Sequence, residues 1–195
     1  MINHTCAVVI VHGKSEYRMV SAIKSKLRLN LVIYAHDKGK SSIQVDGLVK
    51  ELTNTIFKSK KKLLEAYDTI DVEDDVLQDF LIFTIMDVDD VSDQSKRTNY
   101  MAGHISGIGN HPLKAYIRPI YCDKNFEDVL READFEFVAQ SNRQKKRYDE
   151  MFSPGHWPAT EENVREMATR LERSKKTNLD VFLNYCLDHK FKLSD

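Results

Sequence analysis

The chain has 195 residues, 30% charged and 42% hydrophobic, which is typical of one globular domain or of one domain with a helical extension. Its formal net charge of −1 excludes a global basic field, so a nucleic-acid site has to depend on local clusters of lysine and arginine. Three scattered cysteines without zinc-finger spacing, no charged leader and no apolar run of membrane-spanning length favour a cytoplasmic protein with free thiols and no membrane contact.

The first part of the chain reads as strand, helix, strand. The apolar run CAVVIV at residues 6–11 predicts a strand buried on both faces. A turn follows, and Ser15 is the predicted N-cap of an amphipathic helix that continues to Leu27. Residues 31–35, LVIYA, predict a second strand, and the polar segment HDKGKSS at residues 36–42 predicts a loop.

A helical pattern covers residues 43–57 and can run on through KSKKKLLEAYD, whose lysines favour a solvated face over a phosphate patch. Residues 68–79 are acidic and predict a short linker helix. The run FLIFTIM at residues 80–86 has one polar side chain, and it predicts a central strand.

The remaining segments are shorter. We expect a polar loop at residues 92–98, a helix or turn at 99–108 that glycines break into a flexible connection, and a strand at 115–121. Pro119 places that strand at a sheet edge or ends it early, because proline cannot donate a ladder hydrogen bond. Residues 125–131 predict a further helix.

The tail changes in character. A basic segment at residues 143–148 and the break SPGHWP at 153–158 precede two helical patterns at 161–174 and 178–189. We therefore predict an α/β domain over residues 1–142, with a central parallel sheet of about four strands flanked by helices. Residues 143–195 are predicted to form a helical C-terminal extension packed on this core.

Acidic residues follow the third predicted strand, where ligands of open α/β sheets bind. Asp87 and Asp89 point the same way if the strand persists, and with Asp90 they offer the hard oxygen ligands that suit Mg²⁺. If the first and third strands are neighbours, His12 and Gly13 face these carboxylates across one crevice. The alternative is an acidic, solvated loop after a core strand.

Phosphate contacts are expected on the same side. Gly13 permits a sharp turn before a helix with free N–H groups, and Lys14 adds a positive charge. The segment GKSS at residues 39–42 resembles the end of a P-loop, but Tyr34 stands where the first glycine is needed, so an ATPase is excluded. A phosphate contact from Lys38 or Lys40 remains open.

A glycine turn after the first strand and Asp87-Val88-Asp89 after a later strand together resemble the Toprim domain of topoisomerases, primases and nucleases of the overcoming-lysogenization-defect class. The segment VVIVHGKSEYRMVSAIKSKL is most similar to the small bacterial nuclease members. The family glutamate, which does acid/base work, is His12 here, and Glu16 lies one helical turn further on. The resemblance implies catalytic roles for His12, Glu16, Asp87 and Asp89, and Mg²⁺ or Mn²⁺ as cofactor, with histidine favouring Mn²⁺.

Three functions stay open. The first is a divalent-metal-dependent nuclease or phosphodiester-transfer protein that acts on nucleic acid, and the resemblance suggests an ATPase partner in trans. The second is a non-catalytic Toprim-like module that binds nucleic acid, a nucleotide or a protein partner. The third is an unrelated doubly wound domain that binds a small phosphorylated ligand or acts as a receiver with Asp87 as phospho-acceptor. This function is disfavoured because a receiver needs an acidic pair where His12 and Gly13 stand.

Overall fold

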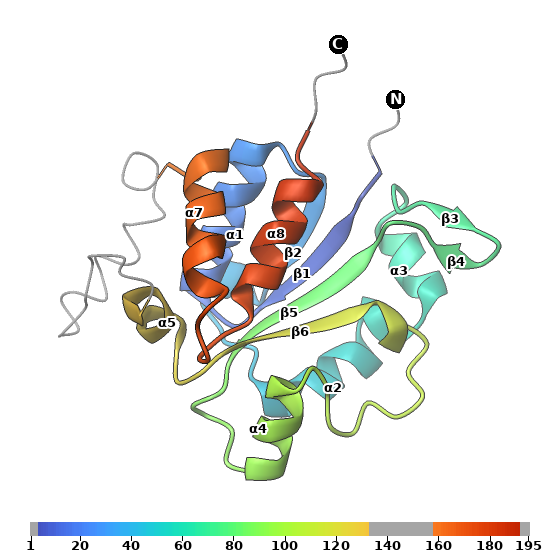
Figure 1. The fold of residues 1–195 in the computed structure, drawn as a ribbon. Coiled ribbons are helices and arrows are strands. Elements are labelled where there is room, and N and C mark those ends of the chain that lie inside the picture. The colour runs from blue at the N-terminus through green and yellow to red at the C-terminus, as the bar shows by residue number, and fades with distance from the viewer. Residues whose placement is uncertain (1–3, 133–157, 192–195) are drawn as a thin grey trace.

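Four parallel strands form the central sheet of the computed structural model, which describes residues 4–132 and 158–191 (Figure 1). The strands are β1 (Ala7–Val11), β2 (Leu31–Tyr34), β5 (Leu81–Asp87) and β6 (Ile117–Cys122). Their order is β2-β1-β5-β6, so β1 and β5 are parallel neighbours at the centre. The predicted α/β fold with helices around a parallel sheet is confirmed.

The central strands are apolar throughout because helices cover both faces of the sheet. Along β1, Val9 and Val11 face one half of the core, whereas Val8 and Ile10 face the other.

Two groups of helices pack on the two faces of the sheet and complete the two halves of the core (Figure 1). The first half contains α1 (Lys14–Leu27), α5 (Phe126–Glu132), α7 (Glu161–Leu171) and α8 (Leu179–Asp188). The second contains α2 (Val45–Asn54), α3 (Lys60–Ala66) and α4 (Gln94–Met101).

The outer edge of β6 is closed by side chains, in agreement with the predicted edge position of Pro119. The side-chain amide of Asn178 accepts from the Tyr121 N–H at 2.9 Å and donates to the Pro119 carbonyl at 3.0 Å. Thr177 donates to the Tyr121 carbonyl at 2.7 Å, and Arg118 donates to the Ile117 carbonyl at 2.9 Å. These contacts occupy backbone groups that another strand would otherwise bind.

The predicted linker helix at residues 68–79 is wrong. The segment forms a hairpin of β3 (Val72–Glu73) and β4 (Val76–Leu77). Asp74 and Asp75 form the turn with φ angles of 49° and 59°. Two consecutive left-handed residues match the twist of a hairpin, and aspartate tolerates this conformation better than most residues.

The continuation of the helix at residues 43–57 through KSKKKLLEAYD, residues 58–68, is also wrong. The backbone of Thr55 is extended, and its hydroxyl accepts from the Phe57 N–H, so that a short 3₁₀ turn, η2 (Ile56–Lys58), separates α2 from α3. Ser59 then caps α3 by accepting from the Lys62 N–H at 3.2 Å. Two capping side chains therefore override the continuous apolar pattern.

The predicted polar loop at residues 92–98 is mostly helix, because Asp93 caps α4 by accepting from the N–H groups of Ser95 and Lys96. After α4, glycines at positive φ turn the chain, and His111 Nε2 lies 3.0 Å from the Leu52 carbonyl. A further 3₁₀ turn, η3 (Lys114–Tyr116), leads into β6. The segment predicted as a flexible connection thus has a defined, hydrogen-bonded path.

The described part of the C-terminal extension packs on the core as expected, with Leu171 of α7 and Phe182 of α8 buried in the same cluster as Val20 of α1. The basic segment at 143–148, the boundary between residues 142 and 143, and most of the break at 153–158 lie outside the described residues. No helix in the described ranges is long and apolar enough to cross a membrane.

Candidate functional site

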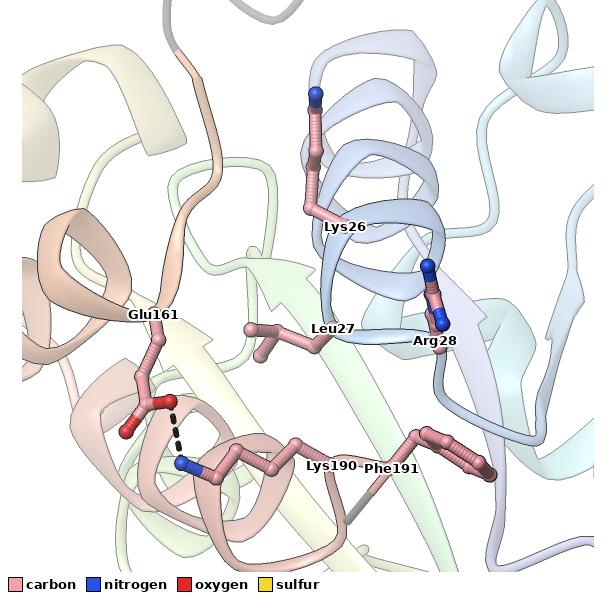
Figure 2. A pocket seen from close by; sticks show the side chains of 6 residues that line it. All are labelled: Lys26, Leu27, Arg28, Glu161, Lys190 and Phe191. Carbon is pink, nitrogen blue, oxygen red and sulfur yellow. Dashed lines mark ion pairs between the residues drawn. The ribbon is translucent and has the colours of Figure 1, made fainter. Parts of the chain in front are cut away.

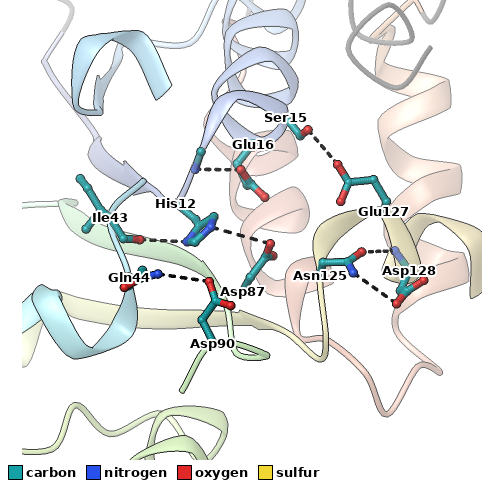
Figure 3. Close-up of polar contacts among 11 residues, drawn as sticks. His12, Ser15, Glu16, Ile43, Gln44, Asp87, Asp90, Asn125, Glu127 and Asp128 are labelled. Carbon is teal, nitrogen blue, oxygen red and sulfur yellow. Dashed lines mark hydrogen bonds and ion pairs between the residues drawn. The ribbon is translucent and has the colours of Figure 1, made fainter. Parts of the chain in front are cut away.

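The carboxyl ends of β1 and β5 bring His12 and Asp87 together. His12 follows β1 directly and its backbone N–H donates to the Ile85 carbonyl at 2.9 Å, while Asp87 is the last residue of β5. The His12 Nε2 lies 4.0 Å from the Asp87 Oδ2, so the two side chains face each other at the ends of the two strands. Figure 3 shows the imidazole between the Ile43 carbonyl and the Asp87 carboxyl group.

The orientation of His12 is fixed from one side. Its Nδ1 lies 3.0 Å from the backbone oxygen of Ile43, and its own carbonyl accepts from the Ile43 N–H at 2.9 Å. Since a carbonyl oxygen can only accept, Nδ1 carries the proton of this hydrogen bond. The imidazole therefore presents Nε2 to Asp87, and in the neutral ring that nitrogen is a proton acceptor or a metal ligand.

Glu16 lies in the first turn of α1. The helix begins two residues earlier than predicted, with Gly13 at the N-cap in place of Ser15. The Glu16 Oε2 accepts from the Gly13 N–H at 2.9 Å, as the third residue of a capping box does. The side chain is buried, and burial together with the nearby Glu127 carboxylate raises its pKa to about 7.

Asp87 is the most perturbed carboxyl group at this edge. Burial raises its pKa to about 9, with further contributions from the negative charges of Glu16, Glu127 and Asp89. Its Oδ1 atom is buried and has no hydrogen-bond partner within the described residues. A buried, unpartnered carboxyl oxygen costs stability, and such groups occur where a site serves binding or catalysis.

Glu127 belongs to the site and was missed in the sequence. It lies in the first turn of α5, which follows β6, and it raises the pKa of both Glu16 and Asp87. The Ser15 hydroxyl donates to its Oε1 at 3.0 Å, which joins the start of α1 to α5 (Figure 3). The signal was available, because a helix that follows a neighbouring parallel strand begins at the same sheet edge.

Asp89 and Asp90 lie at the rim. Both are exposed, and partial burial followed by the charge of Asp90 raises the pKa of Asp89. His12 acts in the opposite direction on the Asp89 pKa, which places the imidazole within electrostatic range of both Asp87 and Asp89. Asp90 accepts from the side-chain amide of Gln44 at 3.2 Å.

The residues predicted to bind phosphate divide into two groups. Gly13 is buried at the centre of the site, and Lys14 is exposed at the first turn of α1. Lys40, by contrast, extends into solvent and lies 3.6 Å from the Asp37 carboxylate. Its neighbour Gly39 packs on the Gly13 backbone, where an added Cβ would lie 2.7 Å from the Gly13 oxygen. The GKSS loop therefore braces the turn after β1 through its glycine.

The donor chemistry of this edge fits the Mg²⁺ or Mn²⁺ that the Toprim resemblance implies. Carboxyl oxygens of Asp87 and Glu16 are hard ligands, the imidazole of His12 suits Mn²⁺, and the unpartnered Oδ1 of Asp87 is available to a cation. Across residues 4–132 and 158–191, no three His, Cys, Asp or Glu side chains are already arranged to hold a metal ion. Binding would therefore require these side chains to adjust.

Comparison of the chain with protein-family models, with curated proteins and with solved structures finds no match in any of the three.

Proposed function

We propose that the chain is a Toprim-like phosphodiester-cleaving protein that acts on nucleic acid with Mg²⁺ or Mn²⁺. One observation carries this proposal: Glu16 and Asp87, two carboxyl groups with raised pKa, meet His12 at the carboxyl ends of adjacent central strands. A fold alone does not specify an activity, so the proposal rests on these side chains.

Each residue has a defined part in the proposed reaction. Asp87 and Asp89 would hold the cation with Glu16, and a bound cation supplies Lewis-acid chemistry at a phosphoryl oxygen. His12, anchored by Ile43, presents Nε2 for proton transfer to or from a reacting oxygen. Glu127 adds negative charge to the same edge, which raises the Asp87 pKa and would also attract a cation.

The proposal is tested by cleavage of plasmid DNA and of short DNA and RNA strands in EDTA, Mg²⁺ or Mn²⁺. We expect cleavage only with a divalent cation, and we expect Mn²⁺ to be at least as effective as Mg²⁺. Asp87→Asn should reduce the rate by about 10²-fold or more, since it removes charge while keeping shape. Asp188→Asn, which changes an exposed carboxylate on α8, is the matched control and should leave the rate unchanged.

Cleavage that persists in Asp87→Asn would exclude this site. A second readout does not depend on turnover: Mn²⁺ should raise the melting temperature more at pH 8 than at pH 5.5, because protons compete with the cation for Asp87 and Glu16. Asp87→Asn should remove this difference.

A second candidate function is the non-catalytic Toprim-like module. The observation that favours it is His12 in place of the family glutamate, together with the lack of a ready-made three-residue metal group among the described residues. If the protein binds nucleic acid without cutting it in either metal, this function replaces the nuclease. An ATPase partner in trans, as in related nucleases, remains part of both proposals.

A further inference from the structure

A second hollow lies away from the acidic edge, beside the first half of β6. Its volume is about 460 Å³, which is within the range of small-molecule sites. The loop after α4 forms one wall, with Ile105 and Ile108, and Ile117 and Pro119 of β6 form another. Cys122 of β6 pairs with Asp87, whereas Ile117, Arg118 and Pro119 line the hollow, so the hollow lies three to five residues, or roughly 10–17 Å, along the strand from the Asp87 level.

The loop wall has a defined shape. Gly103 and Gly107 turn the chain at φ angles of 85° and 82°, which L-residues with side chains rarely adopt. Asn99 donates to the Ser106 hydroxyl at 3.0 Å, and His111 is anchored to the Leu52 carbonyl of α2. The glycines and the anchoring histidine of this segment therefore build a wall of the hollow.

The polar lining is entirely basic or neutral. Lys114, Arg118 and His104 line the hollow, and none of its lining residues is acidic. Within residues 4–132 and 158–191, no carboxylate forms an ion pair with Lys114 or Arg118. Arg118 Nη1 donates to the carbonyls of Ala115 and Ile117, both at 2.9 Å, so its guanidinium group is held in place before any ligand arrives.

Another hollow, at the C-terminal end of α1, differs from the hollow beside β6 in its charges. It measures about 300 Å³ and also contains cations, but Lys190 is already paired with Glu161 across it. Figure 2 shows these two side chains directed at each other, while Lys26 extends along the helix. An anion there would have to displace a carboxylate, whereas at the hollow beside β6 it would meet no competing negative charge.

We propose that the hollow beside β6 binds a nucleotide unit. Two cations supply more positive charge than a single carboxylate needs, and His104 adds a hydrogen-bonding group, which together favour a phosphate monoester as the anion. The isoleucines and Pro119 give apolar walls for the base. The same chemistry belongs to a free nucleotide and to the phosphorylated end of a strand.

Calorimetric titration of the full chain in EDTA tests this proposal, because chelation prevents any metal-dependent binding at the acidic edge. The probes are adenosine monophosphate, adenosine, inorganic phosphate, and one short oligonucleotide with and without a 5′-phosphate. We expect adenosine monophosphate to bind more tightly than adenosine or phosphate alone. Tighter binding of the phosphorylated oligonucleotide than of the mononucleotide would identify a strand end as the ligand, and equal or weaker binding would identify a free nucleotide.

Two variants locate the site. Arg118→Gln and, independently, the exposed Lys114→Gln should each weaken binding by about tenfold, since each removes a charge-assisted contact. Arg28→Gln, at the hollow of Figure 2, is the matched control and should bind normally. The proposal is overturned if no probe binds at millimolar concentration, or if Lys114→Gln and Arg118→Gln both bind as the native chain does. Neither result would bear on the proposed metal-dependent cleavage at Asp87, because the titrations are done in EDTA and the variants lie at a different site.

Discussion

The backbone carbonyl of Ile43 fixes the imidazole of His12 from behind, with 3.0 Å between the Ile43 oxygen and Nδ1. The opposite nitrogen, Nε2, consequently faces Asp87 at 4.0 Å, which is longer than a hydrogen bond. A histidine that donates to a carbonyl through one nitrogen keeps the other for a proton or a metal. This relationship gives the acidic edge one oriented base beside Asp87 and Glu16, two carboxyl groups whose pKa values burial raises.

Stability should fall as pH rises, because of Asp87. Its pKa is raised from 3.8 to about 9 in the folded chain, so between these pH values the native carboxyl keeps a proton that the unfolded chain releases. The free energy of unfolding therefore decreases through this window, by at most about 1.4 kcal/mol per pH unit for one group. Glu16, raised from 4.5 to about 7, adds to the decrease in the lower part of the window.

Asp87→Asn should remove most of this dependence. The variant carries no charge to bury, so its melting temperature should exceed that of the native chain by an increasing margin from pH 5 to pH 9. Thermal unfolding followed by circular dichroism measures the margin, with Asp188→Asn as the exposed control. A margin that stays constant with pH would show that Asp87 is not buried as a protonated carboxyl group.

The sequence was sufficient for the sheet. Residues 6–11 and 80–86 are apolar without alternation because helices cover both faces of these strands. Such a run in the sequence is enough to predict a strand that is buried on both faces. Pro119 likewise predicted an edge strand, because proline lacks the N–H group that a central strand must donate, and β6 does lie at the edge of the sheet. Adjacency of the two apolar strands then placed His12 near Asp87.

Some elements depend on a few local backbone contacts, and the hydrophobic pattern of the sequence did not predict them. An acidic segment at residues 68–79 looks helical by composition, yet Asp74 and Asp75 adopt the left-handed turn of a hairpin. Glu127 is a different case: the signal was available but was missed, because the helix after β6 begins at the same sheet edge once β6 is placed beside β5. The phosphate contact considered for Lys40 stays a prediction; its side chain lies 3.6 Å from the Asp37 carboxylate, and its neighbour Gly39 packs closely on Gly13.

Gly39 should be intolerant of a side chain. Its φ angle is 84°, and an added Cβ would lie 2.7 Å from the Gly13 oxygen and 2.8 Å from the Lys14 Cα. Gly39→Ala therefore combines backbone strain of about 1–2 kcal/mol with a backbone clash. Gly109→Ala is the matched control, because Gly109 also has positive φ but no atom within 4 Å of the added Cβ.

Urea denaturation of both glycine variants separates the two effects. We expect Gly39→Ala to lose clearly more stability than Gly109→Ala, and we expect the loss to be accompanied by weaker Mn²⁺ binding, since the turn after β1 must shift. Equal losses in the two variants would show that the GKSS loop does not brace the site.

Asn178 should be important for stability through its hydrogen bonds to β6. Asn178→Ala leaves the Tyr121 N–H and the Pro119 carbonyl without their partner, and an unsatisfied, partly buried polar group costs about 1–3 kcal/mol. Asn184→Ala, on the exposed side of α8, should change the free energy of unfolding by less than about 0.5 kcal/mol. Chemical denaturation of the two variants gives the comparison, and similar values would mean that water replaces the amide at no cost.

Replacing His12 by glutamate should shift the metal preference of cleavage from Mn²⁺ toward Mg²⁺. The substitution restores the Toprim pattern and adds a hard carboxylate beside Asp87 while removing the imidazole. We expect His12→Glu to keep or increase the Mg²⁺-dependent rate, although it loses the hydrogen bond to Ile43. The ratio of initial rates in Mg²⁺ and Mn²⁺, measured on one labelled oligonucleotide, reports this preference independently of total activity.

The control for this substitution is His4→Glu, which makes the same chemical change at an exposed position near the N-terminus. It should leave the ratio of rates unchanged, so that any shift in His12→Glu is local to the acidic edge. A ratio that stays the same in both variants would show that His12 takes no part in holding the cation. Its Nε2 would then serve proton transfer alone, in which case His12→Gln should lower the rate in both metals by about 10²–10⁴-fold.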